Sequence, residues 1–528
     1  MSDKETVAER LVHLLEVAGA DVLFGIGGTH SLPFLGALER RGSLRFVAAR
    51  NEQGASYMAG GFARSRGRPG VVVTSTGPGA LNALSGIADA RWSSLPLLHI
   101  TTFADEGLFS GGIHESPEQA EVARRVGKSV FRIDSEIVDE TFWEAWHVAQ
   151  TPPEGPVTLE VFSRVWNVQA RGAATEVPTE ISGDTVSCRP GVESVVSALA
   201  SATNPVIFAG GGVIRAGAID SVVDLAERLS APVVTSYQGK PVGDWTHPLY
   251  LGPWGSEPSV RRLFASADVA VVLGSKLSAL STGQWTLPLP ATTFWIDTVT
   301  ADHGRYKEMS FVPGDIRQVC DDLLEQLPEK KTVAVDSVYQ IRQEVTDGAK
   351  ARGPQEWSFV ESLDAVLSDN AAVACDMNKA SFWAAKYLPI SNGRVQSFSS
   401  YLCMGSGVPA AIGMVESGRA MAVALVGDGS LQMSMAEMAT IAERRCPIAI
   451  VVFVDGAYGL LRDNGAAEGV RGSRELGVKL WNPEFRQLAD VYEFDFHSAA
   501  TGKDLADALQ DVRQPTLIAV PFEFSRHW

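Results

Sequence analysis

The chain has few cysteines, and none of them is close to another. Its five cysteines are Cys188, Cys320, Cys375, Cys403 and Cys446, and no Cys-x-x-Cys pair occurs among them. This spacing argues against a disulfide framework and against a zinc site of the usual pattern. A reducing cytoplasm is therefore the expected location.

Positive charge and long apolar segments are also scarce. The formal net charge is -17, whereas proteins that bind nucleic acid need a basic surface that displaces counterions. The longest apolar stretches, such as residues 447–454, have the length of a strand and fall far short of the roughly 20 residues of a membrane helix. The charged beginning of the chain lacks a segment of signal-peptide type. We expect neither nucleic acid nor a membrane as a partner.

Short apolar runs alternating with amphipathic segments are what the sequence does contain. Runs at 22–26, 46–49, 70–75 and 96–101 are each followed by a segment with helical spacing. Strands that are apolar on both faces and separated by helices indicate parallel sheets covered on both sides. The sequence therefore predicts the α/β class.

The length of 528 residues exceeds what one hydrophobic core usually supports. We predict three doubly wound parallel-sheet domains: an N-terminal domain at 1–168, a middle domain at 190–335 and a C-terminal domain at 355–528. A polar linker without periodicity separates the first two at about 169–189. The first and third blocks look like two copies of one architecture.

Two aspartates follow neighbouring buried strands in the third block. Asp428 stands in Gly427-Asp428-Gly429-Ser430, and Asp455 precedes Gly456 and Ala457. Ligands of open α/β sheets bind at the carboxyl ends of the strands, where glycines let the backbone approach a phosphate. Carboxylates there can bind Mg²⁺ and so bridge the protein to phosphate oxygens. The alternative is that both aspartates only cap helices.

This segment resembles the Gly-Asp-Gly to Asn-Asn motif of thiamine-diphosphate enzymes. The resemblance implies that Asp428, Asp455 and the carbonyl of Ala457 bind Mg²⁺, although the family usually has Asn where this chain has Asp455. It also implies that thiamine diphosphate contacts the neighbouring residues Gly427, Gly429, Ser430 and Tyr458.

A second matching segment lies in the N-terminal block. Residues 50–67 resemble the family's glutamate followed by a helix of small residues, which implies that Glu52 protonates the aminopyrimidine ring of the cofactor. Asn51 stands where a histidine is more usual. Taken alone, Glu52 could be a first-turn glutamate favoured by the helix dipole. Residues 71–84 follow at the family spacing and resemble its Gly-Pro-Gly turn, which makes Gly77 a cofactor contact.

Two further segments complete the resemblance, which covers nearly the whole chain. Residues 400–414 resemble the stretch that bends the cofactor, with Met404 as the wedge between its rings and the carbonyl of Leu402 as a hydrogen-bond acceptor. Residues 377–385 resemble a loop that contacts the diphosphate, which implies Asn378 and Ser381 as ligands. Taken alone, Met404 could be a flexible core residue.

The branch of the family depends on pocket residues. Residues 25–35 resemble the pocket loop of benzoylformate decarboxylases, with Thr29 in place of the serine that meets the substrate carboxylate. Residues 71–76 lack the decarboxylase histidine. His30 matches a pocket histidine of benzaldehyde lyases, and His114 lies in a loop that acetolactate synthases place over the cofactor. Either could move protons near neutral pH, or could simply bond to loop backbone.

The predicted activity is therefore decarboxylation of a 2-oxo acid with carboligase capacity. An acyloin lyase or carboligase and an acetolactate-synthase-like transferase are the alternatives within the family. A homologue that binds the cofactor without catalysis is an alternative of another class. The substrate would be a small 2-oxo acid, a 2-hydroxy ketone or an aldehyde.

The resemblance also bears on assembly and on other cofactors. It implies a homodimer at least, and commonly a homotetramer. The glycine run at 208–217 invites a dinucleotide-binding oxidoreductase that uses NAD or FAD, but no acidic residue follows the next apolar run at 232–240. Some relatives bind FAD in this domain. We expect a colourless protein without FAD.

Overall fold

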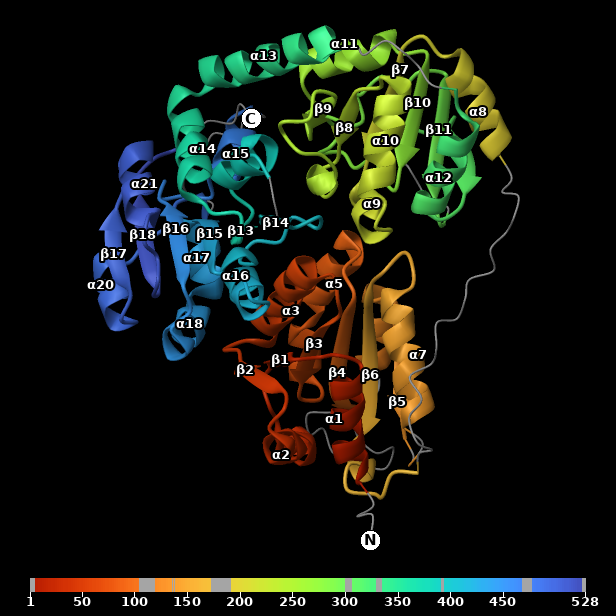
Figure 1. The fold of residues 1–528 in the computed structure, drawn as a ribbon. Coiled ribbons are helices and arrows are strands. Elements are labelled where there is room, and N and C mark those ends of the chain that lie inside the picture. The colour runs from red at the N-terminus through yellow and green to blue at the C-terminus, as the bar shows by residue number, and fades with distance from the viewer. Residues whose placement is uncertain are drawn as a thin grey trace. The chain divides into compact units, whose positions relative to one another are not determined.

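The structure is a computed structural model that contains three parallel sheets of six strands each (Figure 1). This arrangement confirms the predicted α/β class. The residues it describes are 5–103, 119–134, 136, 138–171, 191–299, 306–328, 335–390, 394–467 and 477–524.

The chain divides into two compact units. One comprises residues 1–182, 366–381 and 395–526, and holds the first and third sheets. The other comprises residues 183–365, 382–394 and 527–528, and holds the middle sheet.

The N-terminal sheet has the strand order β2-β1-β3-β4-β6-β5, with every neighbouring pair parallel. Its central strands are buried along their whole length, because helices cover both faces as the continuous apolar runs predict. The strands are β1 (Val22–Gly25), β2 (Arg45–Ala48), β3 (Gly70–Thr74), β4 (Leu97–Phe103), β5 (Ser129–Ile133) and β6 (Pro156–Phe162). The helices are α1 (Val7–Val17), η1 (Thr29–Ser31), α2 (Leu32–Arg41), α3 (Glu52–Arg66), α4 (Pro78–Asn82), α5 (Leu84–Ser93), α6 (Gln119–Val126), α7 (Asp139–Gln150) and η3 (Ser163–Val165).

The C-terminal sheet has the order β14-β13-β15-β16-β18-β17 and is also parallel throughout. Its strands are β13 (Ala371–Cys375), β14 (Val395–Phe398), β15 (Met421–Gly427), β16 (Ile448–Phe453), β17 (Asp495–Ser498) and β18 (Thr516–Val520). Its helices are α15 (Lys379–Tyr387), α16 (Gly407–Glu416), α17 (Asp428–Ser434), η5 (Met435–Glu437), α18 (Met438–Arg444), α19 (Gly459–Ala467), α20 (Phe485–Val491) and α21 (Gly502–Leu509).

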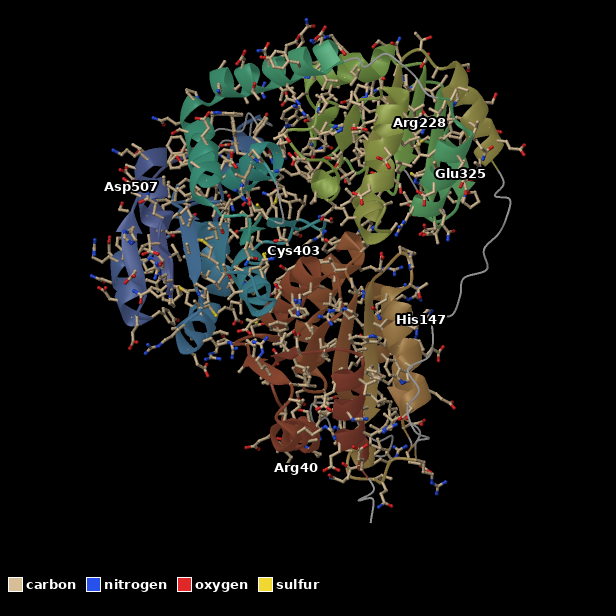
Figure 2. All side chains as sticks on the ribbon, in the orientation of Figure 1. Arg40, His147, Arg228, Glu325, Cys403 and Asp507 are labelled. Atoms are coloured by element: carbon tan, nitrogen blue, oxygen red, sulfur yellow. The ribbon has the colours of Figure 1, made fainter. Side chains whose placement is uncertain are left out.

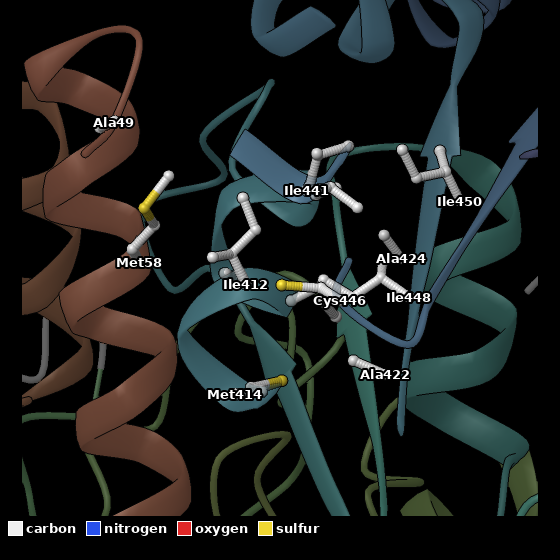
Figure 3. Close-up of a cluster of buried hydrophobic side chains, with 14 of the residues drawn as sticks. Ala49, Met58, Ile412, Met414, Ala422, Ala424, Ile441, Cys446, Ile448 and Ile450 are labelled. Atoms are coloured by element: carbon white, nitrogen blue, oxygen red, sulfur yellow. The ribbon is translucent and has the colours of Figure 1, made fainter. Parts of the chain in front are cut away.

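Helices α3 and α16 join the first and third sheets into one core. Met58 of α3 and Ile412 of α16 belong to the same cluster of buried apolar side chains, and Figure 3 shows both. The helices come so close that a Cβ at Gly413 would lie 1.8 Å from the carbonyl oxygen of Met58. A Cβ at Gly61 would likewise lie 2.2 Å from that of Ala410. Glycine is therefore required at these crossing points.

The middle sheet has the order β12-β11-β10-β7-β8-β9. Read from β9, this is the 3-2-1-4-5-6 winding of dinucleotide-binding sheets, whose order reverses between β7 and β10. Its strands are β7 (Pro205–Ala209), β8 (Val233–Thr235), β9 (Tyr250–Gly252), β10 (Val269–Leu273), β11 (Thr292–Asp297) and β12 (Ser310–Pro313). The helices of this unit are α8 (Val192–Ser201), α9 (Gly211–Arg215), α10 (Ile219–Leu229), η4 (Lys240–Val242), α11 (Pro258–Ser266), α12 (Ile316–Gln326), α13 (Val335–Arg352) and α14 (Pro354–Val366).

The glycine run after β7 packs against the loop after β10. A Cβ at Gly210 would lie 2.2 Å from the carbonyl oxygen of Gly274, and one at Gly212 would lie 2.7 Å from its Cα. These two glycines therefore serve the close approach of two backbone segments. Two helices of this unit are also tied to each other. Arg228 of α10, marked in Figure 2, donates to the carbonyl of Leu327 at the end of α12 at 2.8 Å.

No described helix is both long enough and apolar enough to cross a membrane.

Candidate active site

Asp428 and Asp455 meet at the carboxyl edge of the C-terminal sheet. Asp428 begins α17 directly after β15, and Asp455 follows the neighbouring strand β16. The backbone N–H of Gly456 donates to Oδ2 of Asp428 at 2.8 Å, which ties the two loops together. Burial and the nearby charge of Asp428 raise the pKa of Asp455. The two carboxylates therefore interact, as the order of the strands predicts.

A segment from farther along the chain holds Asp428 in place. The side-chain amide of Asn482 donates to Oδ2 of Asp428 at 2.7 Å, and Gln432 donates to the amide oxygen of Asn482 at 2.8 Å. Backbone hydrogen bonds from Tyr458 to Val478 and from Leu480 to Gly456 align this segment with the loop after β16. The sequence reasoning missed Asn482, because no motif links it to a residue 54 positions earlier.

A pocket of about 480 Å³ opens at the two aspartates. Its lining combines the loops after β13, β15 and β16 with an apolar wall. The lining residues are Met377, Asn378, Lys379, Ala380, Met404, Gly427, Asp428, Gly429, Ser430, Met433, Phe453, Asp455, Ala457, Tyr458, Gly459, Leu460, Leu461, Phe522 and Phe524. Nine residues predicted from the sequence are thus brought into one cavity: Asn378, Met404, Gly427, Asp428, Gly429, Ser430, Asp455, Ala457 and Tyr458.

Asn378 and Ser381 are engaged with each other at the loop after β13. Asn378 donates to the hydroxyl of Ser381 at 2.9 Å and accepts from its backbone N–H at 2.9 Å. Both side chains also donate to the carbonyl of Leu425. Ser381 is completely buried and is not part of the pocket lining. The two side chains therefore hold the loop in shape, while Asn378 also faces the cavity.

Two cations lie beside Asp455, and neither was anticipated. Lys379 lines the pocket and pairs with Asp463 at 2.7 Å and with Glu523 at 3.6 Å. Arg462 lies 3.5 Å from Oδ2 of Asp455. Part of the charge added by the second carboxylate is therefore offset within the chain.

Two aspartates shape the loop that carries Leu402 and Met404. Asp376 accepts the backbone N–H groups of Gly405 at 3.1 Å and Gly407 at 2.6 Å. Burial raises the pKa of Asp376. Leu402 has a left-handed backbone with a φ of 58° and lies outside the pocket lining.

The second of these aspartates, Asp89, comes from α5 beside the N-terminal sheet. It accepts the hydroxyl of Ser399 at 2.7 Å and the backbone N–H of Tyr401 at 3.3 Å. Burial raises its pKa as well. A residue of the first sheet's helical layer thus fixes a loop of the third sheet.

Glu52 lies at the corresponding edge of the N-terminal sheet. It begins α3, and the side chain of Asn82 donates to its Oε2 at 3.1 Å. A Cβ at Gly79 would lie 3.0 Å from Oε1, so the turn after β3 packs closely against the carboxylate. Glu52 is only partly buried and does not line the pocket around Asp428. This single chain therefore supplies the two predicted halves of the site separately.

The other predicted N-terminal residues follow β1 and β3, which neighbour each other. Thr29 and His30 lie in η1, with Thr29 exposed and His30 partly buried. Gly77 has a φ of 59° and donates its N–H to the side chain of Gln119 at 2.8 Å. His114 lies outside the described residues.

One histidine of this sheet is buried within it. His99 on β4 bonds to the hydroxyl of Thr74 at 2.9 Å and to that of Thr158 at 3.3 Å. Burial lowers the pKa of His99 to about 4, so the ring is neutral at ordinary pH. Its position marks it as part of the sheet core.

The chemistry of the donor set indicates what the pocket can hold. Among the described residues, no group of three or more His, Cys, Asp or Glu side chains could hold a metal ion. A cation at Asp428 and Asp455 would therefore need further oxygen ligands, from a backbone carbonyl such as that of Ala457, from water or from a bound molecule. A diphosphate offers such oxygens, and the pocket of about 480 Å³ beside the two aspartates has room for it. The residues present fit a metal-bridged diphosphate.

Comparison with family models matches three segments of the chain. Residues 5–122 match the N-terminal TPP binding domain of thiamine pyrophosphate enzymes, residues 192–323 match their central domain, and residues 376–520 match their C-terminal TPP binding domain.

Curated relatives cover most of the chain. It is 30% identical to a probable acetolactate synthase large subunit of Methanocaldococcus jannaschii, over 92% of this chain and 86% of that protein. It is 30% identical to the acetolactate synthase isozyme 1 large subunit of Escherichia coli, over 86% and 83%. It is 28% identical to a probable 2-ketoarginine decarboxylase of Pseudomonas aeruginosa, over 92% and 88%. The chain therefore belongs to the thiamine pyrophosphate enzymes and is an enzyme of carbon-carbon bond formation or cleavage, related to acetolactate synthases.

Proposed function

We propose that this enzyme decarboxylates a 2-oxo acid on thiamine diphosphate and transfers the resulting acyl group to a carbonyl acceptor. The observation that carries the proposal is the pair Asp428 and Asp455 at the base of a pocket with an apolar wall. When bound, the cofactor supplies a nucleophilic carbon and an electron sink for the bond that breaks. The protein selects the substrate and moves protons.

The C-terminal sheet would hold the diphosphate half of the cofactor. Asp428, Asp455 and the carbonyl of Ala457 would bind Mg²⁺, which prefers oxygen ligands. The loop around Gly427, Gly429 and Ser430 would let backbone groups approach the phosphates. Tyr458 and Asn378 line the same cavity.

The remaining contacts are proposed on the same grounds. Met404 lines the pocket and would separate the two rings of the cofactor. Ser381 would not contact the cofactor directly; it would stabilise the loop that does. Leu402 would accept a hydrogen bond through its carbonyl, and Gly77 would shape the pocket around the pyrimidine ring.

Glu52 would donate a proton to the ring nitrogen of the aminopyrimidine. A carboxyl group that holds a proton near neutral pH needs a desolvated site, which a partly buried position does not provide. A second copy of the chain would supply that enclosure, so we propose a homodimer at least and a homotetramer as its larger assembly.

Exposed apolar side chains support the contact with a second copy. Several lie in the unit that holds the first and third sheets, namely Leu81, Trp92, Tyr401, Leu402, Met433 and Trp481. The rings of Trp92 and Tyr401 stack with their centroids 6.0 Å apart. Exposed aromatic side chains that lie together are typical of sites covered by another protein.

Transfer to a carbonyl acceptor is preferred over release of an aldehyde. Release requires a proton donor at the reacting carbon, and residues 71–76 lack the histidine that decarboxylases of this family have there. The acetolactate synthase relatives agree with acyl transfer. Thr29 would meet the substrate carboxylate, and His30 and His114 would move protons during the reaction.

The second candidate is a decarboxylase that releases an aldehyde, as expected from the benzoylformate-decarboxylase-like loop. The probable 2-ketoarginine decarboxylase among the relatives favours it. Incubation with thiamine diphosphate, Mg²⁺ and a panel of 2-oxo acids, alone and with aldehyde or 2-oxo acid acceptors, separates the two.

Hydroxy-ketone or acetohydroxy-acid products are expected, and their rate of formation should fall steeply in Glu52→Gln. Aldehyde as the main product in the presence of acceptors would favour the second candidate. No turnover of any 2-oxo acid would contradict both. The absorption spectrum of the same preparation tests the expectation of a colourless protein without FAD, and fractionation of cells tests the expected cytoplasmic location.

A further inference from the structure

Glu437 is a buried carboxylate that the reaction described so far does not use. It ends η5, nine residues after Asp428, and only 1% of it is exposed. Burial raises its pKa, because a charged carboxylate loses its hydration there. A buried acid of this kind is expensive unless its oxygens find donors.

The donors come from the segment just before Glu52. The backbone N–H of Arg50 lies 3.0 and 3.2 Å from the two carboxylate oxygens of Glu437, and the N–H of Asn51 lies 3.1 Å from Oε1. Thr440 adds its hydroxyl at 2.9 Å. The positive charge of Arg50 also favours the ionised carboxylate, although its guanidinium bonds to the carbonyl of Ala48 and to Glu443.

The carboxylate of Glu437 also packs closely against the first turn of α3. A Cβ at Gly54 would lie 2.3 Å from Oε1 of Glu437, so only glycine allows the carboxylate to approach this closely. Asn51 caps the same turn, with its side chain accepting the N–H of Gln53 at 2.8 Å. The backbone on both sides of Glu52 is therefore held.

The side chain of Glu52 is fixed separately by Asn82, at 3.1 Å. We propose that Glu437 is a positioning residue for Glu52: by holding the N–H groups of Arg50 and Asn51, it sets where the catalytic carboxyl group points. This inference rests on the proposed function. It also means that η5, which continues directly from the helix that begins with Asp428, sets the place of the acid.

Glu437→Ala and Glu437→Gln test the proposal, with Glu416→Gln as the matched control. Glu416 is also a buried carboxylate that joins the two sheets, since it pairs with Arg45 of β2 and with Arg444. Within the described part of the chain, its hydrogen bonds go to Arg45 and Arg444 and not to residues 50–54. Loss of Glu416 should lower thermal stability without moving Glu52.

Two measurements are made on each variant. Calorimetry gives the dissociation constant of thiamine diphosphate with Mg²⁺, and quenched NMR gives the rate at which the C2 proton of the bound cofactor exchanges with D₂O. Glu437→Ala should slow the exchange by about 100-fold, the usual cost of a misplacement of about 1 Å. Glu437→Gln keeps one acceptor oxygen and should slow it less. The dissociation constant should stay within about 3-fold in both, because the diphosphate contacts are retained.

A double-mutant cycle separates positioning from general destabilisation. In the Glu52→Gln background, Glu437→Ala should slow the exchange no further, because the group that it positions is already absent. An unchanged exchange rate in both Glu437 variants, or an equal slowing in Glu416→Gln, would overturn the inference. If the unmodified enzyme failed to bind thiamine diphosphate, the proposed function itself would fall, which is a different result from intact binding with unchanged exchange.

Discussion

The N-terminal and C-terminal sheets have the same winding but different chemistry. Their strand orders, β2-β1-β3-β4-β6-β5 and β14-β13-β15-β16-β18-β17, correspond strand by strand. The turn after β3 has Gly77, whereas the corresponding turn after β15 has Asp428. The architecture therefore places loops at one edge, and the loop residues alone decide what that edge binds.

The two edges also differ in how far a single chain encloses the predicted site residues. The C-terminal edge closes around a pocket within one chain, and its aspartate Asp428 is only 2% exposed. At the N-terminal edge, Glu52 is partly exposed and lies outside that pocket. On the proposed function, binding of the metal and diphosphate belongs to one sheet, whereas activation of the cofactor needs both.

The sharpest test of this division is Glu52→Gln. Turnover should fall by about 10²- to 10⁴-fold, the usual contribution of a general acid, while the dissociation constant of thiamine diphosphate changes little. Steady-state kinetics and calorimetry measure the two effects. Glu39→Gln, at an exposed position on α2, is the control. A large loss of cofactor affinity would mean that the two edges do not divide the work.

Asp428→Asn should give the opposite pattern. Removing the carboxylate that faces the cation should weaken Mg²⁺-dependent cofactor binding by about 100-fold, an estimate from the coordination preferences of Mg²⁺ and the size of ligand-shell effects. Titration calorimetry with and without Mg²⁺ measures it. Asp490→Asn, on the exposed side of α20, is the control. Unchanged affinity would remove Asp428 from the metal site.

Acid should weaken the N-terminal sheet before the C-terminal one. His99 lies on β4, whereas the corresponding strand β16 is apolar throughout. The pKa of His99 is lowered from 6.5 to about 4, so its contribution to stability is complete above pH 6.5 and is lost as the pH falls toward 4. From pH 7 to pH 5 the loss should be about 2 kcal/mol.

Hydrogen exchange of amides in β3 and β4 against those in β15 and β16 measures this difference. The N-terminal strands should lose protection first, and His99→Gln should reduce the pH dependence. Equal loss of protection in both sheets would show that another group controls the acid response.

The smallest effect is expected from Asp455→Asn, which restores the residue usual in the family. Removing one negative charge opposite a diphosphate should tighten cofactor binding, but by no more than about 10-fold, because a charge so close to solvent and to Arg462 is screened. Calorimetry again measures it, and Asp463→Asn is the control for loss of a nearby charge. Unchanged or weaker binding would show that the second carboxylate is needed.

The sequence was sufficient to predict the fold and nine of the residues that line the pocket. Apolar runs mark the strands, and residues that follow neighbouring parallel strands must meet, so Asp428 and Asp455 could be placed without coordinates. The repeated architecture of the first and third blocks is confirmed by their strand orders.

Residues that act through tertiary contacts could not be predicted. Glu437, Asp89 and Asn482 each hold a segment far away in the chain, at 387, 310 and 54 residues' separation. Nothing in the local pattern distinguishes them from surface residues, since their partners are mostly backbone groups or amides without a motif. For His30 and His114 the sequence offers a resemblance alone, and their roles stay predictions.

Leu402 has a consequence for any attempt to produce part of this enzyme. Its left-handed backbone costs a leucine about 1 kcal/mol, so local preference alone would not select it. Asp89, contributed from outside the C-terminal sheet, binds the residues on its N-terminal side. A truncated protein that begins after the middle sheet would lack that anchor, and should keep its aspartate pair while its 399–405 turn relaxes to another shape.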